Sequence, residues 1–139
     1  LIERWHGAEN GRLRYAFAPR FVLSCSEELM RKVAALAKEL DVRIHTHASE
    51  NSTECDLVRE KTGLDNVAYF ASLELLGPRT TLAHCVWLTA EEQRLLRETR
   101  TCVCHCPSAN FKLASGTAKK LDAWPIGWLE KGKAGLTIV

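Results

Sequence analysis

Residues 43–51 read Arg-Ile-His-Thr-His-Ala-Ser-Glu-Asn, and this stretch decides the fold. A short β-branched segment gives way here to a polar turn, with His47 and Glu50 three residues apart. That is a suitable place for a metal ligand and a proton shuttle. His84 and His105 also end short apolar runs. Three run-ending histidines in one small chain form a pattern, which predicts that they share a site.

The segments on either side of this stretch alternate between strand and helix patterns. We expect strands at 14–18, 42–47, 80–84 and 101–106, and helices that begin near 24, 51, 66 and 89. This order is typical of a parallel sheet with crossover helices. In such sheets functional residues gather at the carboxyl ends of the strands, where the three histidines are placed.

Capping signals support the expected helices. Ser24 with Glu27, and Asn51 with Glu54, have capping-box spacing. Gly63 should end the second helix near residue 62, and the third should run from 66 to 76. In the first helix, one apolar stripe is expected to face the core; it consists of Leu29, Val33, Leu36 and Leu40.

Composition limits the classes of function. The chain has 139 residues, a 46% apolar fraction typical of one globular domain, and a net charge of +2 without a basic stripe. We therefore expect no nucleic-acid partner. No apolar stretch reaches the ~20 residues of a membrane helix, and no signal peptide is visible, so we expect no membrane association and a cytoplasmic location. Six cysteines inside apolar runs indicate buried, reduced thiols rather than disulfides.

Three motifs occur in a set order: His-Ala-Ser-Glu at 47–50, Leu-Ala-His-Cys at 82–85, and His-Cys-Pro-Ser-Ala-Asn-Phe-Lys-Leu-Ala-Ser-Gly at 105–116. They resemble consecutive strand ends of the amidohydrolase superfamily, in its branch of aminohydrolases that act on purines and triazines. Within that branch the chain is most similar to deaminases of 5′-deoxyadenosine, methylthioadenosine and S-adenosylhomocysteine. The resemblance covers residues 1–116.

The resemblance implies an α/β fold, the (β/α)8 TIM-like barrel. Such a barrel takes about 250 residues, so we expect a partial barrel, about strands four to seven with their helices, over residues 1–116. The His-x-His pair of the first strand and the aspartate of the eighth are missing from this sequence. Residues 117–139 depart from the family pattern, and we treat them as an atypical C-terminal segment for which truncation or a frameshift is a hypothesis.

The resemblance also implies the chemistry. One divalent metal, Zn or Fe, would activate water to attack the ring carbon that carries an amino group. His47 would be a metal ligand, Glu50 the general acid/base that moves a proton from the water to the ring nitrogen, and His84 a hydrogen-bond partner of the attacking hydroxide or the tetrahedral intermediate. Imidazole suits zinc, and a nearby carboxylate can shuttle the proton.

Further candidates carry weaker signals. Arg20, Asn110 and His105 are candidate substrate-binding residues. His45 alternates with His47 on the strand and should point to the same face, so it is a candidate to support His47 rather than to bind the metal. The alternatives are a solvated arginine at Arg20, a structural role for His105, and a helix-capping carboxylate at Glu50. A zinc knot built from His105 with Cys102, Cys104 and Cys106 is not expected, because strand alternation puts the thiols and the imidazole on opposite faces.

The expected function is metal-dependent hydrolytic deamination of a small purine nucleoside or base, most similar to adenosine, by a protein that is a homo-oligomer when complete. The alternatives are a guanine or 8-oxoguanine deaminase, a triazine chlorohydrolase, or a catalytically incomplete barrel remnant that acts as a binding module. We expect the isolated 139-residue chain to be inactive, because one or two ligands cannot hold a catalytic metal in the required geometry.

Overall fold

A computed structural model describes residues 1–116, in which four parallel strands form one sheet in the order β1-β2-β3-β4. The strands are β1 (Ala16–Phe17), β2 (Arg43–Ala48), β3 (Thr80–His84) and β4 (Cys102–Cys104). The helices are α1 (Ile2–Trp5), α2 (Ala8–Gly11), the 3-10 turn η1 (Val22–Ser24), α3 (Glu27–Glu39), α4 (Ser52–Thr62), α5 (Asn66–Ser72), α6 (Ala90–Thr99) and α7 (Pro107–Lys112). Within residues 1–116 no helix has the length and apolarity to cross a membrane.

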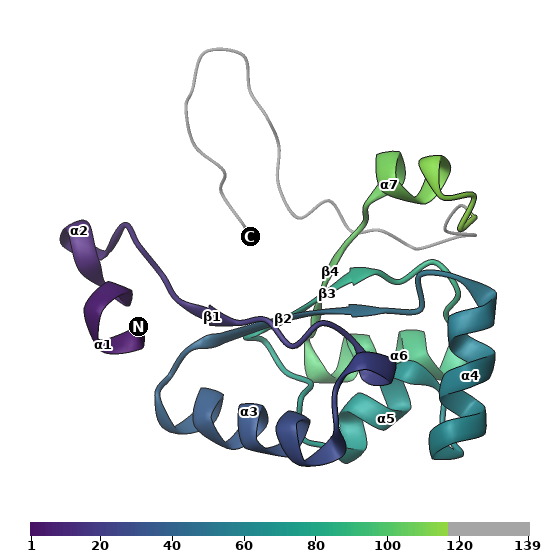
Figure 1. Cartoon of the computed structure of the whole chain (residues 1–139), viewed down its shortest axis with the longest axis horizontal. Coiled ribbons are helices and arrows are strands. Elements are labelled where there is room, and N and C mark those ends of the chain that lie inside the picture. The colour runs from purple at the N-terminus through teal and green to yellow at the C-terminus, as the bar shows by residue number, and fades with distance from the viewer. Residues whose placement is uncertain (117–139) are drawn as a thin grey trace.

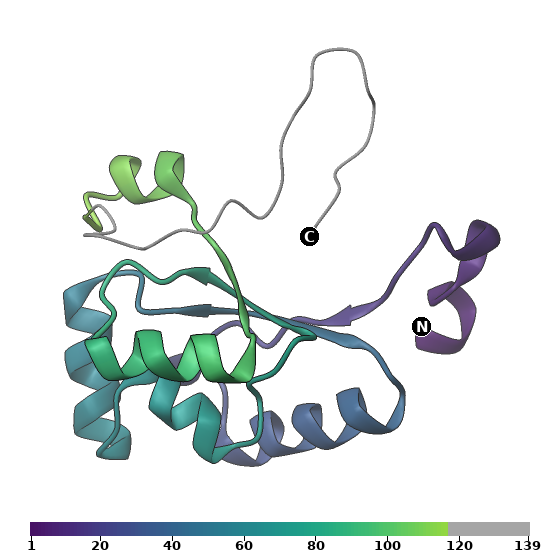
Figure 2. The same cartoon turned by 180° about the vertical axis from the view of Figure 1, so that it is seen from behind.

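The helices are distributed unequally over the two faces of the sheet. Helices α3, α4, α5 and α6 cover one face, and both views show them together on the same side (Figures 1 and 2). Helix α7, which follows β4, lies on the other side of the sheet (Figure 1). The strands β1, β2 and β3 are each followed by helices on a single face, which is the layout of a wall of a (β/α) barrel.

The burial of β2 follows the pleat of a strand covered on one side. Ile44, Thr46 and Ala48 are buried, whereas His45 is exposed and His47 half-buried. Because successive side chains point to opposite faces, both histidines lie on the face away from α3 to α6. The expectation that His45 and His47 share a face is therefore confirmed.

The core fills the space between the sheet and its helices. Phe70 of α5 and Leu82 of β3 are both 0% exposed, and the same apolar cluster includes Val58 of α4 and Met30 of α3. Fully burying such side chains contributes about 1.5–3 kcal/mol each. The core therefore fixes the helix-covered face and holds the carboxyl ends of β2 and β3 in place.

The expected alternation of strands and helices is confirmed, and several bounds are corrected. The strand at 80–84 is correct. The strands at 14–18 and 101–106 shorten to Ala16–Phe17 and Cys102–Cys104, and the helix at 66–76 ends at Ser72.

The start of α3 is also corrected. Ser26 caps the helix, since its side chain accepts a hydrogen bond from the Leu29 amide at 3.2 Å, while Ser24 belongs to η1. The predicted stripe is wrong by one position: Leu29 and Leu40 are exposed, and the buried residues are Met30, Val33 and Ala37. Both stripes have helical spacing and share Val33, so periodicity alone does not distinguish them.

The remaining caps are as expected. The Asn51 side chain accepts from the Glu54 amide at 2.9 Å at the start of α4. Gly63 ends α4 in the left-handed region, with φ 75°. Thr89 opens α6 with a reciprocal capping box to Glu92.

All six cysteines are free, but the expected burial holds for only two of them. Cys55 and Cys85 are buried, and burial raises the pKa of both thiols. Cys104 is exposed, and the other three are half-buried. A thiol with a raised pKa forms little thiolate at neutral pH, so Cys55 and Cys85 act as small apolar residues of the core.

The 139-residue chain alone is expected to self-associate or to be poorly soluble. Among the described residues, β1 and β4 each pair on one side only, and unpaired strand edges promote association. Large apolar side chains are also exposed, among them Trp5, Leu13, Phe111 and Leu113. Size-exclusion chromatography with light scattering measures the outcome, and a monodisperse, cooperatively melting monomer would contradict the expectation.

Candidate active site

The ring of His47 is oriented by main-chain contacts at the carboxyl end of β2. The Arg20 carbonyl oxygen lies 3.0 Å from the His47 amide and 2.8 Å from His47 Nδ1. A carbonyl oxygen only accepts, so Nδ1 carries the proton and donates it to Arg20. Nε2 therefore keeps its lone pair. A backbone carbonyl that fixes the tautomer in this way is typical of histidines that ligate metals.

His84 ends β3 with an unusual backbone conformation. The strand register pairs His84 with Ala48, a residue on the helix-covered face. However, the His84 φ of 73° is in the left-handed region, and its ring stacks on that of His47 with centroids 5.4 Å apart. Such a conformation costs a non-glycine residue about 1–3 kcal/mol and is concentrated at functional sites. The strained turn places the two imidazoles together.

Asn110 of α7 fixes the tautomer of His84. Its Oδ1 lies 2.7 Å from His84 Nδ1, so Nδ1–H donates to the amide oxygen. Asn110 is 1% exposed, and its Nδ2 has no hydrogen-bond partner in the described part of the chain. The His84 Nε2 lone pair consequently points away from Asn110, into the site.

Glu50 faces this lone pair. Its Oε2 lies 3.7 Å from His84 Nε2, at the range of an ion pair rather than a direct hydrogen bond. Carboxylate and neutral Nε2 are both acceptors. The space between them can therefore take a donor, either a proton on His84 or an O–H or N–H group of a ligand. This arrangement can hold and transfer a proton.

The other predicted residues are placed differently. His45 stacks on His47 with centroids 6.1 Å apart and is exposed. Arg20 reaches the site through its carbonyl, whereas its guanidinium lies over the Phe21 ring at 5.0 Å. His105 is exposed just beyond β4. The structure thus gathers His45, His47, Glu50, His84 and Asn110, but not the side chains of Arg20 and His105.

Sequence reasoning missed two contacts here. The carbonyl of Arg20 carries no side-chain signal, and Asn110 was considered for the substrate pocket rather than as the partner of His84. In residues 1–116 no three His, Cys, Asp or Glu side chains lie close enough to hold a metal ion. His47, with its free Nε2, fits a divalent metal as a single ligand, so further ligands would have to come from outside the described residues.

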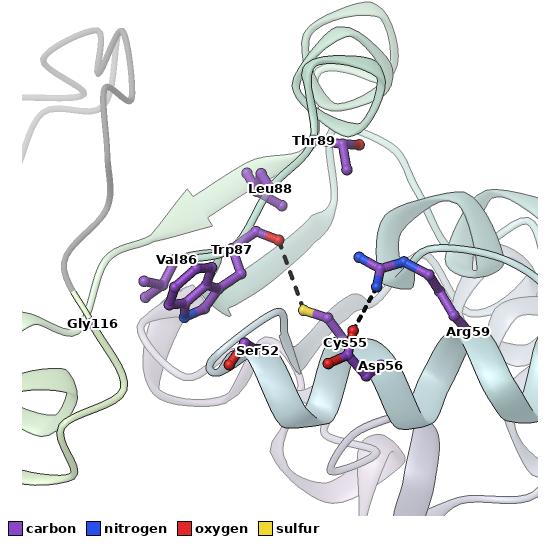
Figure 3. A pocket seen from close by; sticks show the side chains of 9 residues that line it. All are labelled: Ser52, Cys55, Asp56, Arg59, Val86, Trp87, Leu88, Thr89 and Gly116. Atoms are coloured by element: carbon purple, nitrogen blue, oxygen red, sulfur yellow. Dashed lines mark hydrogen bonds and ion pairs between the residues drawn. The ribbon is translucent and has the colours of Figure 1, made fainter.

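A separate cavity of about 520 Å³ lies between α4 and the loop after β3 (Figure 3). Cys55 donates to the Trp87 carbonyl across it at 3.8 Å, and Arg59 pairs with Asp56 at 2.7 Å. The lining consists of Ser52, Cys55, Asp56, Arg59, Val86, Trp87, Leu88, Thr89 and Gly116. None of the candidate site residues is among them, so the cavity and the histidine cluster are distinct.

Several known proteins are similar to this chain in sequence or in fold. The 5′-deoxyadenosine deaminase of Methanothermobacter thermautotrophicus is 43% identical over 118 residues, 85% of this chain and 28% of that protein. The 8-oxoguanine deaminase of Pseudomonas aeruginosa is 46% identical over 123 residues, 88% of this chain and 27% of that protein. An adenosine deaminase structure from Xanthomonas campestris with bound zinc has a TM-score of 0.77 at 30% identity, covering 81% of this chain and 26% of that one.

The chain therefore spans little more than a quarter of the length of these relatives. Together with the parallel sheet and the layer formed by α3 to α6, that coverage confirms the expected fold class, a partial (β/α)8 barrel. The pattern of the amidohydrolase family matches residues 1–128. The chain belongs to the amidohydrolase family.

Proposed function

We propose that the barrel to which this chain contributes hydrolytically deaminates a purine nucleoside or base, with an adenosine-like compound as the first candidate. The observation that carries the proposal is the cluster of His47, Glu50 and His84 at two adjacent strand ends. Its support comes from a 5′-deoxyadenosine deaminase at 43% identity that shares this part of the barrel.

The roles follow from the tautomers. His47 Nε2 would be one ligand of a divalent metal, Zn or Fe, which when bound polarises the attacking water. His84 Nε2 accepts a hydrogen bond from that water, because Asn110 keeps the proton on Nδ1. Glu50 takes a proton from the water and delivers it to the ring nitrogen. The remaining hydroxyl proton of the added water then moves to the amino group, the C–N bond breaks, and ammonia leaves while the attacked carbon becomes a carbonyl.

The three candidate substrate-binding residues are proposed to have different roles. Asn110 is buried and already bound to His84, which favours positioning of His84 over direct contact with substrate. Arg20 and His105 are both exposed and remain predicted substrate contacts. His45 is proposed to support His47 through ring stacking. We also propose that the complete protein forms a homo-oligomer.

A second candidate is an 8-oxoguanine or guanine deaminase. One observation favours it: the 8-oxoguanine deaminase of P. aeruginosa is 46% identical over the matched segment. The residues that select the purine substituents would then lie largely outside this chain, so the segment by itself supplies the proton-transfer machinery of either enzyme.

The test is an exchange of segments. Residues 1–116 replace the matching segment of the M. thermautotrophicus 5′-deoxyadenosine deaminase, which supplies the rest of the barrel; we call this protein the exchanged barrel. Ammonia release is measured with 5′-deoxyadenosine, adenosine, guanine and 8-oxoguanine, and chloride release is measured with a chlorotriazine. We expect deamination of the adenosine-like compounds, its loss with a chelator and its return with zinc, and no activity from the 139-residue chain alone.

The control is the unexchanged relative, assayed in parallel. A folded exchanged barrel that binds zinc but releases no ammonia from the purine compounds would contradict the proposal, and one that also releases no chloride from the chlorotriazine would favour a binding module.

A further inference from the structure

Two buried glutamates hold the same position in two helices but bind differently. Glu54 is the third residue of α4, and Glu92 is the third residue of α6. Glu92 makes an ordinary capping box, accepting from the amide of its N-cap Thr89 at 2.9 Å. Its other oxygen accepts from the Val67 amide at 2.9 Å. Glu92 therefore holds helix ends together.

The Glu54 carboxylate does not accept a hydrogen bond from the amide of its own N-cap residue, Asn51. Its two carboxylate oxygens accept from the amides of Ser49 at 3.1 Å and Glu50 at 2.9 Å, both of which precede the cap. The Glu54 side chain is therefore bound to the main chain of the residue assigned as the proton shuttle. Glu54 is 6% exposed, and hydrogen bonds to a buried carboxylate are charge-assisted. Its place in the first turn of α4 further favours the negative charge.

The same turn is bound from its other side. Ser49 has a φ of 52°, and its carbonyl accepts from the amides of Val86 at 2.9 Å and Trp87 at 3.0 Å. Those two residues follow the strand end that carries His84. A conformation that Ser49 would rarely adopt alone is thus fixed from both sides, by Glu54 through the amides and by the loop after β3 through the carbonyl.

We propose that Glu54 is a positioning residue for Glu50: its carboxylate clamps two consecutive main-chain amides and fixes the Glu50 side chain opposite His84. Glu54 touches no reacting atom in this assignment. The inference rests on the proposed function for its effect on catalysis, but not for the clamp itself. A misplacement of about 1 Å at a catalytic group can cost 10²-fold in rate, which is the effect that the clamp would prevent.

The test compares three glutamate-to-glutamine variants in the exchanged barrel. Glutamine at position 54 has a single acceptor and turns an N–H group toward one of the two amides. Glu54→Gln is expected to lower kcat by about 10–100-fold with KM within about threefold. Glu92→Gln, a buried residue at the equivalent helix position, should lower the melting temperature while keeping kcat within about twofold. Glu60→Gln, on the exposed face of α4, should change neither.

Hydrogen exchange gives a second measurement that needs no activity. In the exchanged barrel, Glu54→Gln is expected to increase exchange of the Ser49 and Glu50 amides at least tenfold, with β2 unchanged. Equal exchange at these amides in the parent and Glu54→Gln would overturn the clamp. Loss of kcat no greater than in Glu92→Gln would overturn the positioning role. If the parent exchanged barrel is inactive but Glu54→Gln still exchanges faster than the parent at the Ser49 and Glu50 amides only, the proposed function is rejected and the clamp is supported.

Discussion

Glu50→Gln is expected to lower kcat of the exchanged barrel by about 10²–10⁴-fold, the range that a positioned general acid or base contributes. The substitution keeps the shape of the side chain but removes the group that accepts a proton. Glu50 Oε2 lies 3.7 Å from His84 Nε2, so a neutral amide at this position leaves the water and the ring nitrogen without a proton carrier. KM should change little, because the substrate can still enter the site.

Steady-state kinetics with 5′-deoxyadenosine measures this effect, and zinc content is determined on the same samples. Glu60→Gln, the same chemical change on the exposed face of α4, is the matched control and should keep kcat at the parent value. A Glu50→Gln variant that keeps full zinc and more than a tenth of the parent kcat would contradict the role of Glu50 in proton transfer.

The sequence predicted the parts of the site that topology alone determines. Strand ends of a parallel sheet meet at one edge, so a histidine and a glutamate after β2 and a histidine after β3 are brought together once the strand order is known. The alternation of side chains along the strand also predicted that His45 and His47 share a face. The burial pattern of β2 agrees with this prediction. Local signals, such as the cap at Asn51 and the stop at Gly63, were read correctly for the same reason: their hydrogen bonds involve neighbours in sequence.

The sequence could not predict features that depend on distant partners. A strict pleat would place His84 on the helix-covered face with its register partner Ala48, and only the left-handed backbone turns its ring toward His47. The link from Asn110 to His84 spans 26 residues. The capping-box spacing of Glu54 correctly predicted a helix start, but its carboxylate binds two earlier amides instead of the cap.

Packing of the helices on the covered face of the sheet should stabilise the fold that carries this site. The substitution Phe70→Ala tests this expectation. Phe70 of α5 is 0% exposed and belongs to the apolar cluster that includes Leu82 of β3. Removing a buried phenylalanine side chain loses its transfer free energy and leaves a cavity, so the free energy of unfolding should fall by about 3–5 kcal/mol. Because β3 ends in His84, loss of this packing should also reduce deaminase activity as the folded population falls.

Phe111→Ala is the matched control for this prediction, since it makes the same change in α7 at a side chain that is 68% exposed. Surface substitutions of this kind usually stay within about 0.5 kcal/mol. Urea unfolding of the exchanged barrel, followed by tryptophan fluorescence, compares the two variants with the parent. Equal destabilisation by the two variants would show that the core does not lie between α5 and the sheet. A large loss at Phe70 alone would show that packing of α5 on the sheet supplies stability of the size needed to offset the strain of the left-handed backbone at His84.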